Sequence, residues 1–155
     1  MTLNPDEFAH LARAVQLAGD ARSHGNHPFG AILVTASGTT IEAENTVLTA
    51  GDPTGHAETN LVRLASASLG ADEVGASTLY TSTEPCAMCC GAIFWAGIPR
   101  VVYALAESEL VAMNPPEHTL SLPSRDIFAR GGRATAVSGP HEVPGVRAVH
   151  DGFWS

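Results

Sequence analysis

The sequence predicts an α/β fold, a three-layer α/β/α sandwich in a single domain over residues 1–155. Short segments typical of strands alternate along the chain with longer segments of helical spacing. Strands separated by helices require a sheet that is covered by helices on both faces. The chain shows no internal repeat or linker-like break, and a 45% share of hydrophobic residues is enough for one core without disulfides.

A helix and a hairpin account for the first third of the chain. Asn4 is a favourable N-cap, and Pro5 a favourable first residue, for a helix over residues 5–24. Two segments of strand character follow, the apolar run Gly30–Val34 and the alternating Thr40–Glu44. Because a Ser-Gly turn lies between them, the two strands are expected to form a hairpin.

Two helices and two strands are expected in the middle of the chain. A helix over residues 56–69 follows an Asp-Pro-Thr-Gly loop and stops at a glycine. Residues 78–82 and 101–104 have the length and composition of buried strands. Between them, residues 85–96 predict a helix in which Pro85 takes the first position.

The pattern weakens after residue 104. Short helices are expected near Glu107–Met113 and over residues 125–129, with a proline-rich loop between them. No element is assigned to the remaining residues.

The charge distribution argues against a nucleic-acid or membrane partner. All eight basic residues are arginines, scattered along a chain whose formal net charge is −8. Proteins that bind nucleic acids gather basic residues to neutralise phosphates. No apolar run reaches 18 residues, so no membrane span is expected. Since the first residues lack the pattern of a secretory signal, the expected compartment is the cytoplasm.

Two clusters of possible metal ligands stand at the starts of two predicted helices. His56 begins a His-x-Glu motif, and Cys86 and Cys89 form a Pro-Cys-x-x-Cys motif. Cysteines three residues apart share one helix face, and the positive end of the helix dipole favours their thiolates. A catalytic zinc takes three protein ligands and leaves one position for water, whereas a structural zinc takes four. We therefore predict Zn²⁺ on His56, Cys86 and Cys89.

Glu58 is the predicted catalytic residue. It lies two residues from His56, so its carboxylate cannot easily join the same coordination geometry, but it can lie beside the reacting water. There it would pass a proton from the water to a ring nitrogen of the substrate and later protonate the leaving ammonia.

Three alternatives compete with a catalytic zinc site. Cys86 and Cys89 could be buried thiols packed as small hydrophobic residues, which would make the His-x-Glu motif a coincidence. They could also form a redox pair, which would leave that motif unexplained. Cys90 could complete a structural zinc site, although adjacent cysteines seldom both point at one ion. Cys90 is instead expected in the core.

These two motifs resemble those of the cytidine deaminase-like superfamily. The resemblance covers residues 29–103 and is greatest to the branch of guanine deaminase, small cytosine deaminases and tRNA adenosine deaminases. It implies a five-stranded mixed sheet, zinc on the three residues above, Glu58 as the proton shuttle and a homodimer. It also implies the hydrolytic deamination of a small nucleobase or nucleoside, with guanine or a related aminopurine as the leading substrate. Cytosine or another aminopyrimidine is the alternative, and tRNA adenosine is a weaker one.

The resemblance implies three substrate contacts. Asn45 matches an asparagine that hydrogen-bonds the base, although a turn at the end of a strand would also explain it. Phe29 lies in a Pro-Phe-Gly segment typical of guanine deaminases and would stack on the ring or pack in the core. The Ala57 amide, at a helix start, would bind the ring oxygen or the oxygen derived from water.

Three segments depart from the guanine deaminase pattern. Thr59 and Asn60 follow the His-Ala-Glu motif, and residues 113–120, which include His118, do not match the acidic loop of that enzyme. The aromatic tail around Trp154 suits a lid over a flat ring in its own site or in a neighbouring subunit's site. Simple docking of the C-terminus would also explain the tail. His118 and Trp154 are therefore candidate substrate contacts.

Overall fold

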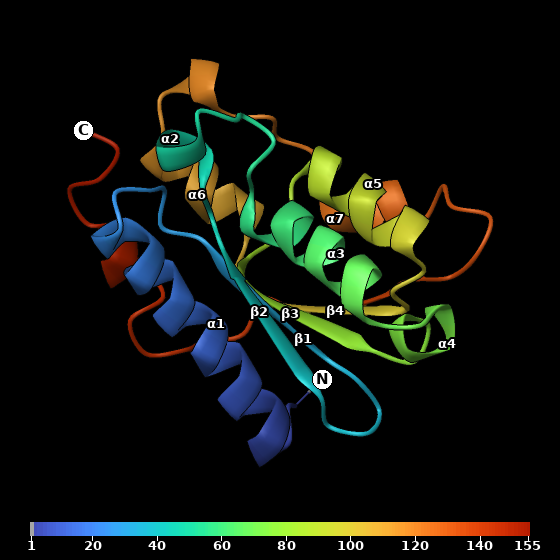
Figure 1. Cartoon of the computed structure of the whole chain (residues 1–155). Helices are drawn as coiled ribbons and strands as arrows, with labels where there is room; N and C mark the ends of the chain where they lie inside the picture. Colours follow the sequence, from blue (N-terminus) through green and yellow to red (C-terminus); the bar gives the residue numbers. More distant parts are fainter. Residues whose placement is uncertain (1) are drawn as a thin grey trace.

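A computed structural model describes residues 2–155 as a three-layer α/β/α sandwich (Figure 1). The helices and strands are, in chain order, α1 (Pro5–Ser23), β1 (Gly30–Val34), β2 (Thr40–Glu44), α2 (Val47–Ala50), α3 (Ala57–Ser68), α4 (Ala71–Val74), β3 (Thr78–Thr83), α5 (Ala87–Ala96), β4 (Arg100–Leu105), α6 (Glu107–Met113), η1 (Pro116–His118), α7 (Ser124–Phe128), β5 (Ala136–Ser138) and η2 (Ala148–His150). In the described part of the chain, no helix has both the length and the hydropathy needed to span a bilayer.

One mixed sheet forms the middle layer, with the strand order β2-β1-β3-β4-β5. Strand β1 pairs antiparallel with both β2 and β3, whereas β3, β4 and β5 run parallel to one another. Parallel neighbours need a crossover, and α5 supplies it between β3 and β4. The predicted hairpin and the five-stranded mixed sheet are both confirmed.

Helix α1 covers one face of the sheet, and α3 and α5 cover the other (Figure 1). Successive strand residues point to opposite faces. In β3, Leu79 therefore packs in the core beneath α3 and α5, while its neighbour Tyr80 packs in the core beneath α1. Since the central strands are buried on both faces, they read as nearly continuous apolar runs in the sequence.

The sequence did not predict α2, α4 or β5. Each has only three or four residues, which is too few for a hydrophobic period to be recognised. Strand β5 is fixed by its pairing with β4, a contact between segments that are far apart in the chain.

The predicted position of Pro85 in the helix is wrong. Helix α5 begins at Ala87, and its N-cap is Cys86, with φ −68° and ψ 173°. The extended backbone at Cys86 turns the chain from β3 into the helix, and its carbonyl accepts the first helical hydrogen bond, from Cys90 N at 2.9 Å. Pro85 therefore lies one residue before the cap.

The close approach of α1 to β1 requires a glycine at position 30. A Cβ atom there would lie 2.5 Å from Leu17 Cβ and 2.6 Å from the Ala14 carbonyl oxygen. Because backbone atoms cannot move aside easily, we expect Gly30→Ala to lower the free energy of unfolding by about 1–3 kcal/mol in urea denaturation.

Gly91 provides the control for this substitution. A Cβ at Gly91, on α5, would meet nothing within 4 Å. Gly91→Ala should therefore leave stability unchanged or raise it by up to about 1 kcal/mol through helix propensity. A stable Gly30→Ala variant would show that α1 does not approach β1 this closely.

Candidate active site

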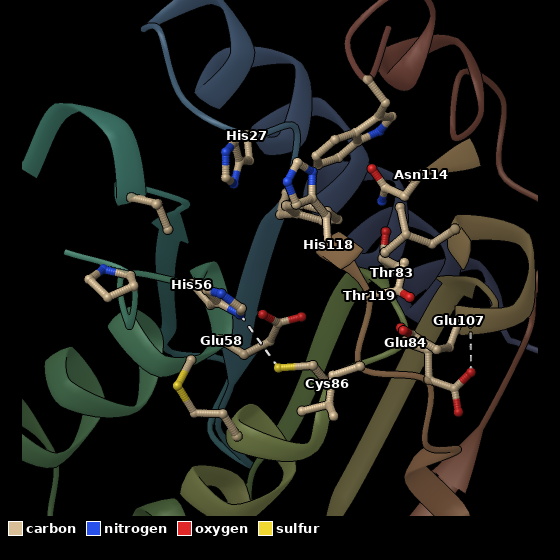
Figure 2. Close-up of a pocket in the computed structure, with 17 residues that line it drawn as sticks. His27, His56, Glu58, Thr83, Glu84, Cys86, Glu107, Asn114, His118 and Thr119 are labelled. Atoms are coloured by element: carbon tan, nitrogen blue, oxygen red, sulfur yellow. Dashed lines mark hydrogen bonds between the residues drawn. The ribbon is translucent and has the colours of Figure 1, made fainter. Parts of the chain in front are cut away.

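The N-termini of α3 and α5 meet beside the end of β3 (Figure 2). His56 is the N-cap of α3 and Cys86 is the N-cap of α5, both with extended backbones. Cys89 lies in the first turn of α5 and is fully buried. The fold therefore brings an imidazole together with two thiols that lie about 30 residues further along the chain.

The donor atoms of His56, Cys86 and Cys89 fit a tetrahedral zinc ion. All three lie within 4.8 Å of one another. His56 Nδ1 is 3.5 Å from Cys86 Sγ and 3.6 Å from Cys89 Sγ. A tetrahedral zinc with ordinary Zn–N and Zn–S bonds separates these atoms by about 3.6 Å. With three protein donors, such a site keeps its fourth position for a water or a substrate.

Cys90 points away from this group. It is not among the three residues whose donor atoms converge, and its thiol donates to the Pro85 carbonyl oxygen at 3.4 Å. Burial raises the pKa of the Cys90 thiol, so it remains protonated. These contacts place Cys90 in the core and not in a closed metal site.

The environment favours a thiolate at Cys86. The hydrogen bond with Cys89 is the largest influence on the pKa of the Cys86 thiol and lowers it, and the hydrogen bond with His56 lowers it further. The contact between His56 and Cys86 also raises the pKa of His56. Next to them, Thr59 Oγ1 lies 3.2 Å from Cys89 Sγ, within range of a hydrogen bond that supports a metal ligand. The sequence departure at Thr59 thus falls beside the predicted zinc ligands.

Glu58 lies next to the three donors without joining them. It is 5% exposed, and its Oε1 accepts a hydrogen bond from Thr81 Oγ1 at 2.6 Å. Burial is the largest influence on the pKa of Glu58 and raises it. A buried carboxyl beside a cavity and beside the donor group has the position required of a proton carrier.

A cavity of about 620 Å³ opens beside this group (Figure 2). This volume lies within the usual range for sites that bind small molecules. Phe29, His118 and Trp154 line the cavity together with His56 and Glu58. Three of the five predicted substrate contacts therefore reach the same space as the predicted catalytic residue.

Asn45 and Ala57 do not line this cavity. Asn45 is 1% exposed, and its Oδ1 accepts a hydrogen bond from Val47 N at 3.0 Å, the turn geometry that was its alternative explanation. Ala57 is fully buried at the first position of α3. Their substrate contacts stay predictions. The neighbouring Asn60 donates to Glu44 O and Thr46 Oγ1, both at 2.9 Å, and so ties the start of α3 to β2.

Several polar residues of the cavity wall were missed in the sequence. Thr83 is the last residue of β3, Glu107 follows β4 at the start of α6, and Asn114 follows α6. Within the described residues, Thr83 Oγ1 and Asn114 Oδ1 have no hydrogen-bond partner. Burial raises the pKa of Glu107 to about 7. A signal did exist, because polar residues at the carboxyl ends of parallel strands often mark ligand sites.

Glu84 also lines the cavity, but its carboxylate is used within the fold. One oxygen accepts from Glu107 N at 2.9 Å, and the other accepts from the backbone and hydroxyl of Ser124. Glu84 therefore ties the starts of α6 and α7 to the loop that carries Cys86.

The C-terminal tail reaches the cavity of its own chain. Trp154 lines the cavity, and its Nε1 donates to His150 Nδ1 at 3.1 Å. The Trp154 ring lies 5.5 Å from the ring of His27 and 6.0 Å from that of Phe29. The tail thus adds aromatic surface to one side of the space in which a flat ring would lie.

Comparisons with known proteins agree with this geometry. Residues 5–105 match the family described as the cytidine and deoxycytidylate deaminase zinc-binding region. A probable cytosine deaminase of Schizosaccharomyces pombe is 37% identical over an alignment of 158 positions, which covers 98% of this chain and 94% of that protein. Guanine deaminase of Bacillus subtilis is 46% identical over 106 residues, 68% of this chain and 66% of that protein. A solved structure of guanine deaminase from Nitrosomonas europaea superposes with a TM-score of 0.77 at 25% identity, over 97% of this chain and 85% of that one.

Metal analysis tests the ligand set. We expect about one zinc ion per chain, and we expect Cys89→Ser to lose it because two donors no longer suffice for tight binding. Cys90→Ala is the matched control, since it removes a neighbouring thiol that faces the Pro85 carbonyl. Loss of zinc from the Cys90 variant would instead favour a closed, four-ligand site.

Stability of the tail should depend on pH through His150. The ring is 4% exposed, and burial lowers its pKa to about 4, whereas an unfolded histidine titrates near 6.5. The folded state therefore binds fewer protons, so the contribution of His150 is complete above about pH 6.5 and is lost as pH falls towards about 4. The loss amounts to about 3 kcal/mol.

Urea denaturation of the parent and His150→Gln between pH 4 and pH 7 measures this contribution. The parent should lose stability more steeply than the variant as pH falls, because the variant has no group to protonate at that position. Parallel curves for the two proteins would show that His150 is not buried in its neutral form.

Proposed function

Since the chain belongs to the cytidine and deoxycytidylate deaminase zinc-binding family and is a zinc-dependent hydrolytic deaminase, we propose that it acts on a free aminopurine, with guanine as the leading substrate. The observation that carries the proposal is the meeting of Glu58, the three metal donors and one cavity lined by aromatic rings. A nucleoside of the same base is included in the substrate class.

The proposed reaction exchanges an amino group for oxygen. Zinc, when bound to His56, Cys86 and Cys89, supplies a Lewis acid that makes a water acidic near neutral pH. Glu58 takes a proton from the attacking water and delivers it to the adjacent ring nitrogen. It then carries the second water proton to the departing amino group, so that the C–N bond breaks, ammonia leaves and a ring carbonyl remains.

The charge of the cavity supports a base or nucleoside over a nucleotide. Glu58, Glu84 and Glu107 line it, and no arginine of residues 2–155 does. A phosphate group would therefore meet acidic side chains with no arginine to balance its charge. A neutral ring with N–H donors suits the same wall, because Thr83 and Asn114 line it and their side-chain oxygens have no hydrogen-bond partner within residues 2–155.

Two observations support a purine. The 46% identity to B. subtilis guanine deaminase exceeds the 37% identity to the S. pombe protein, although the latter match covers almost the whole chain. The cavity of about 620 Å³ has Phe29 and Trp154 on its walls, which gives a two-ring substrate aromatic surface to stack against. Cytosine or another aminopyrimidine is the second candidate.

We further propose a homodimer in the cytoplasm that does not bind nucleic acid. Trp95 on α5 is 81% exposed and Leu64 on the neighbouring α3 is 49% exposed, which supports an apolar contact with a second copy. The three cysteines are all unpaired, as is usual in a reducing compartment. A net charge of −8 with scattered arginines supports the absence of a nucleic-acid partner.

Ammonia release from a panel of bases, nucleosides and nucleotides tests the substrate class. We expect the highest kcat/KM for guanine, and values at least about tenfold lower for nucleoside monophosphates because of their charge. Glu58→Gln should retain zinc and fold yet lose at least a factor of about 10² in kcat.

Three results would contradict the proposal. They are the absence of ammonia release from every panel member, full activity of Glu58→Gln, and salt-sensitive binding of total tRNA in a gel shift. The last would point to an edited RNA in place of a small substrate.

A further inference from the structure

A threonine occupies a fully buried core position beneath the predicted catalytic residue. In β3, Leu79 and Thr81 point to the same face of the sheet, and Leu79 packs in the core under α3 and α5. Thr81 is 0% exposed. A buried hydroxyl is unfavourable unless it finds a hydrogen-bond partner, so its presence in place of an aliphatic side chain needs a reason.

The partner of Thr81 is the carboxyl of Glu58. Thr81 Oγ1 lies 2.6 Å from Glu58 Oε1, a length typical of hydroxyl–carboxylate hydrogen bonds. The same hydroxyl lies 3.0 Å from the carbonyl oxygen of Thr83. A threonine hydroxyl has a single proton and two lone pairs, so it cannot donate to both oxygens at once.

We propose that Thr81 is a positioning residue that holds the Glu58 carboxyl in place beside the metal donors. The Thr81 hydroxyl donates to Glu58 Oε1 at 2.6 Å and so fixes the rotation of the carboxyl group. This inference rests on the proposed role of Glu58 as the proton carrier.

The sheet fixes the hydroxyl in position. The backbone of Thr81 is paired with Ala31 of β1 on one side and with Tyr103 of β4 on the other. It therefore sits in the middle of the sheet, where the backbone has little freedom. A group held by a rigid strand gives Glu58 a more precise support than a loop residue would give.

Thr81→Val and Thr81→Ser separate the hydroxyl from the shape of the side chain. Valine keeps the volume but removes the hydroxyl, so we expect kcat to fall at least about tenfold. Because Thr81 does not line the cavity, KM should stay within about twofold of the parent. Serine keeps the hydroxyl and should restore kcat to within about threefold.

The assay uses zinc-loaded protein and the panel member that the parent deaminates fastest, with zinc content and thermal stability measured for each variant. Thr81→Ala, which also lacks the hydroxyl, should repeat the loss of kcat. Ser77→Ala is the control, because its buried hydroxyl bonds only locally to the Val74 carbonyl just before β3. Its kcat should match that of the parent.

Glu58→Gln, run in parallel, distinguishes the two proposals. If Glu58→Gln remains active, the proposed function of Glu58 fails. If Glu58→Gln is inactive while Thr81→Val keeps the parent kcat, the inference about Thr81 alone is overturned. Equal losses in Thr81→Val and Thr81→Ser, or a change confined to KM, would also overturn it, because packing and not the hydroxyl would then be responsible.

Discussion

The meeting of two helix N-termini is the constraint on which the rest of the structure depends. His56 caps α3 and Cys86 caps α5, and both caps are extended so that their side chains face each other at 3.5 Å. The aligned peptide dipoles of each helix add a positive partial charge at its N-terminus, which favours thiolates there. The β3–α5–β4 crossover places α5 on the sheet, and α3 packs against α5 on the same face.

Strand β3 serves the core and the site at the same time. Leu79 and Tyr80, its second and third residues, pack in the cores on opposite faces of the sheet. Towards its carboxyl end the same alternation carries hydroxyls, at Thr81 beneath Glu58 and at Thr83 on the cavity wall. These two hydroxyls thus take positions that apolar side chains would otherwise fill. The Thr81 hydroxyl has a hydrogen-bond partner, and Thr83 lines the cavity.

The surroundings of the cavity limit what can enter it. Carboxylates and aromatic rings line its walls, and Trp154 of the same chain adds to one side of it. The tail that carries Trp154 is held by the buried His150 and by Arg22, whose guanidinium donates to the Val149 carbonyl at 2.9 Å. Aromatic walls and acidic groups together favour a flat ring that presents N–H groups.

The sequence by itself determined the reaction class and most long elements, and it predicted His56, Cys86, Cys89 and Glu58 as site residues, because these depend on local spacing and on residue chemistry. Periodicity also fixed the three layers, since strands that alternate with helices have few ways to pack. The tertiary structure alone decided the partner of Glu58 and the wall formed by Thr83, Glu107 and Asn114. It also decided the pairing of β5 with β4 and the position of the C-terminal tail at the cavity. The physical reason is that each of these rests on contacts between residues far apart in the chain, or on segments too short to show a period.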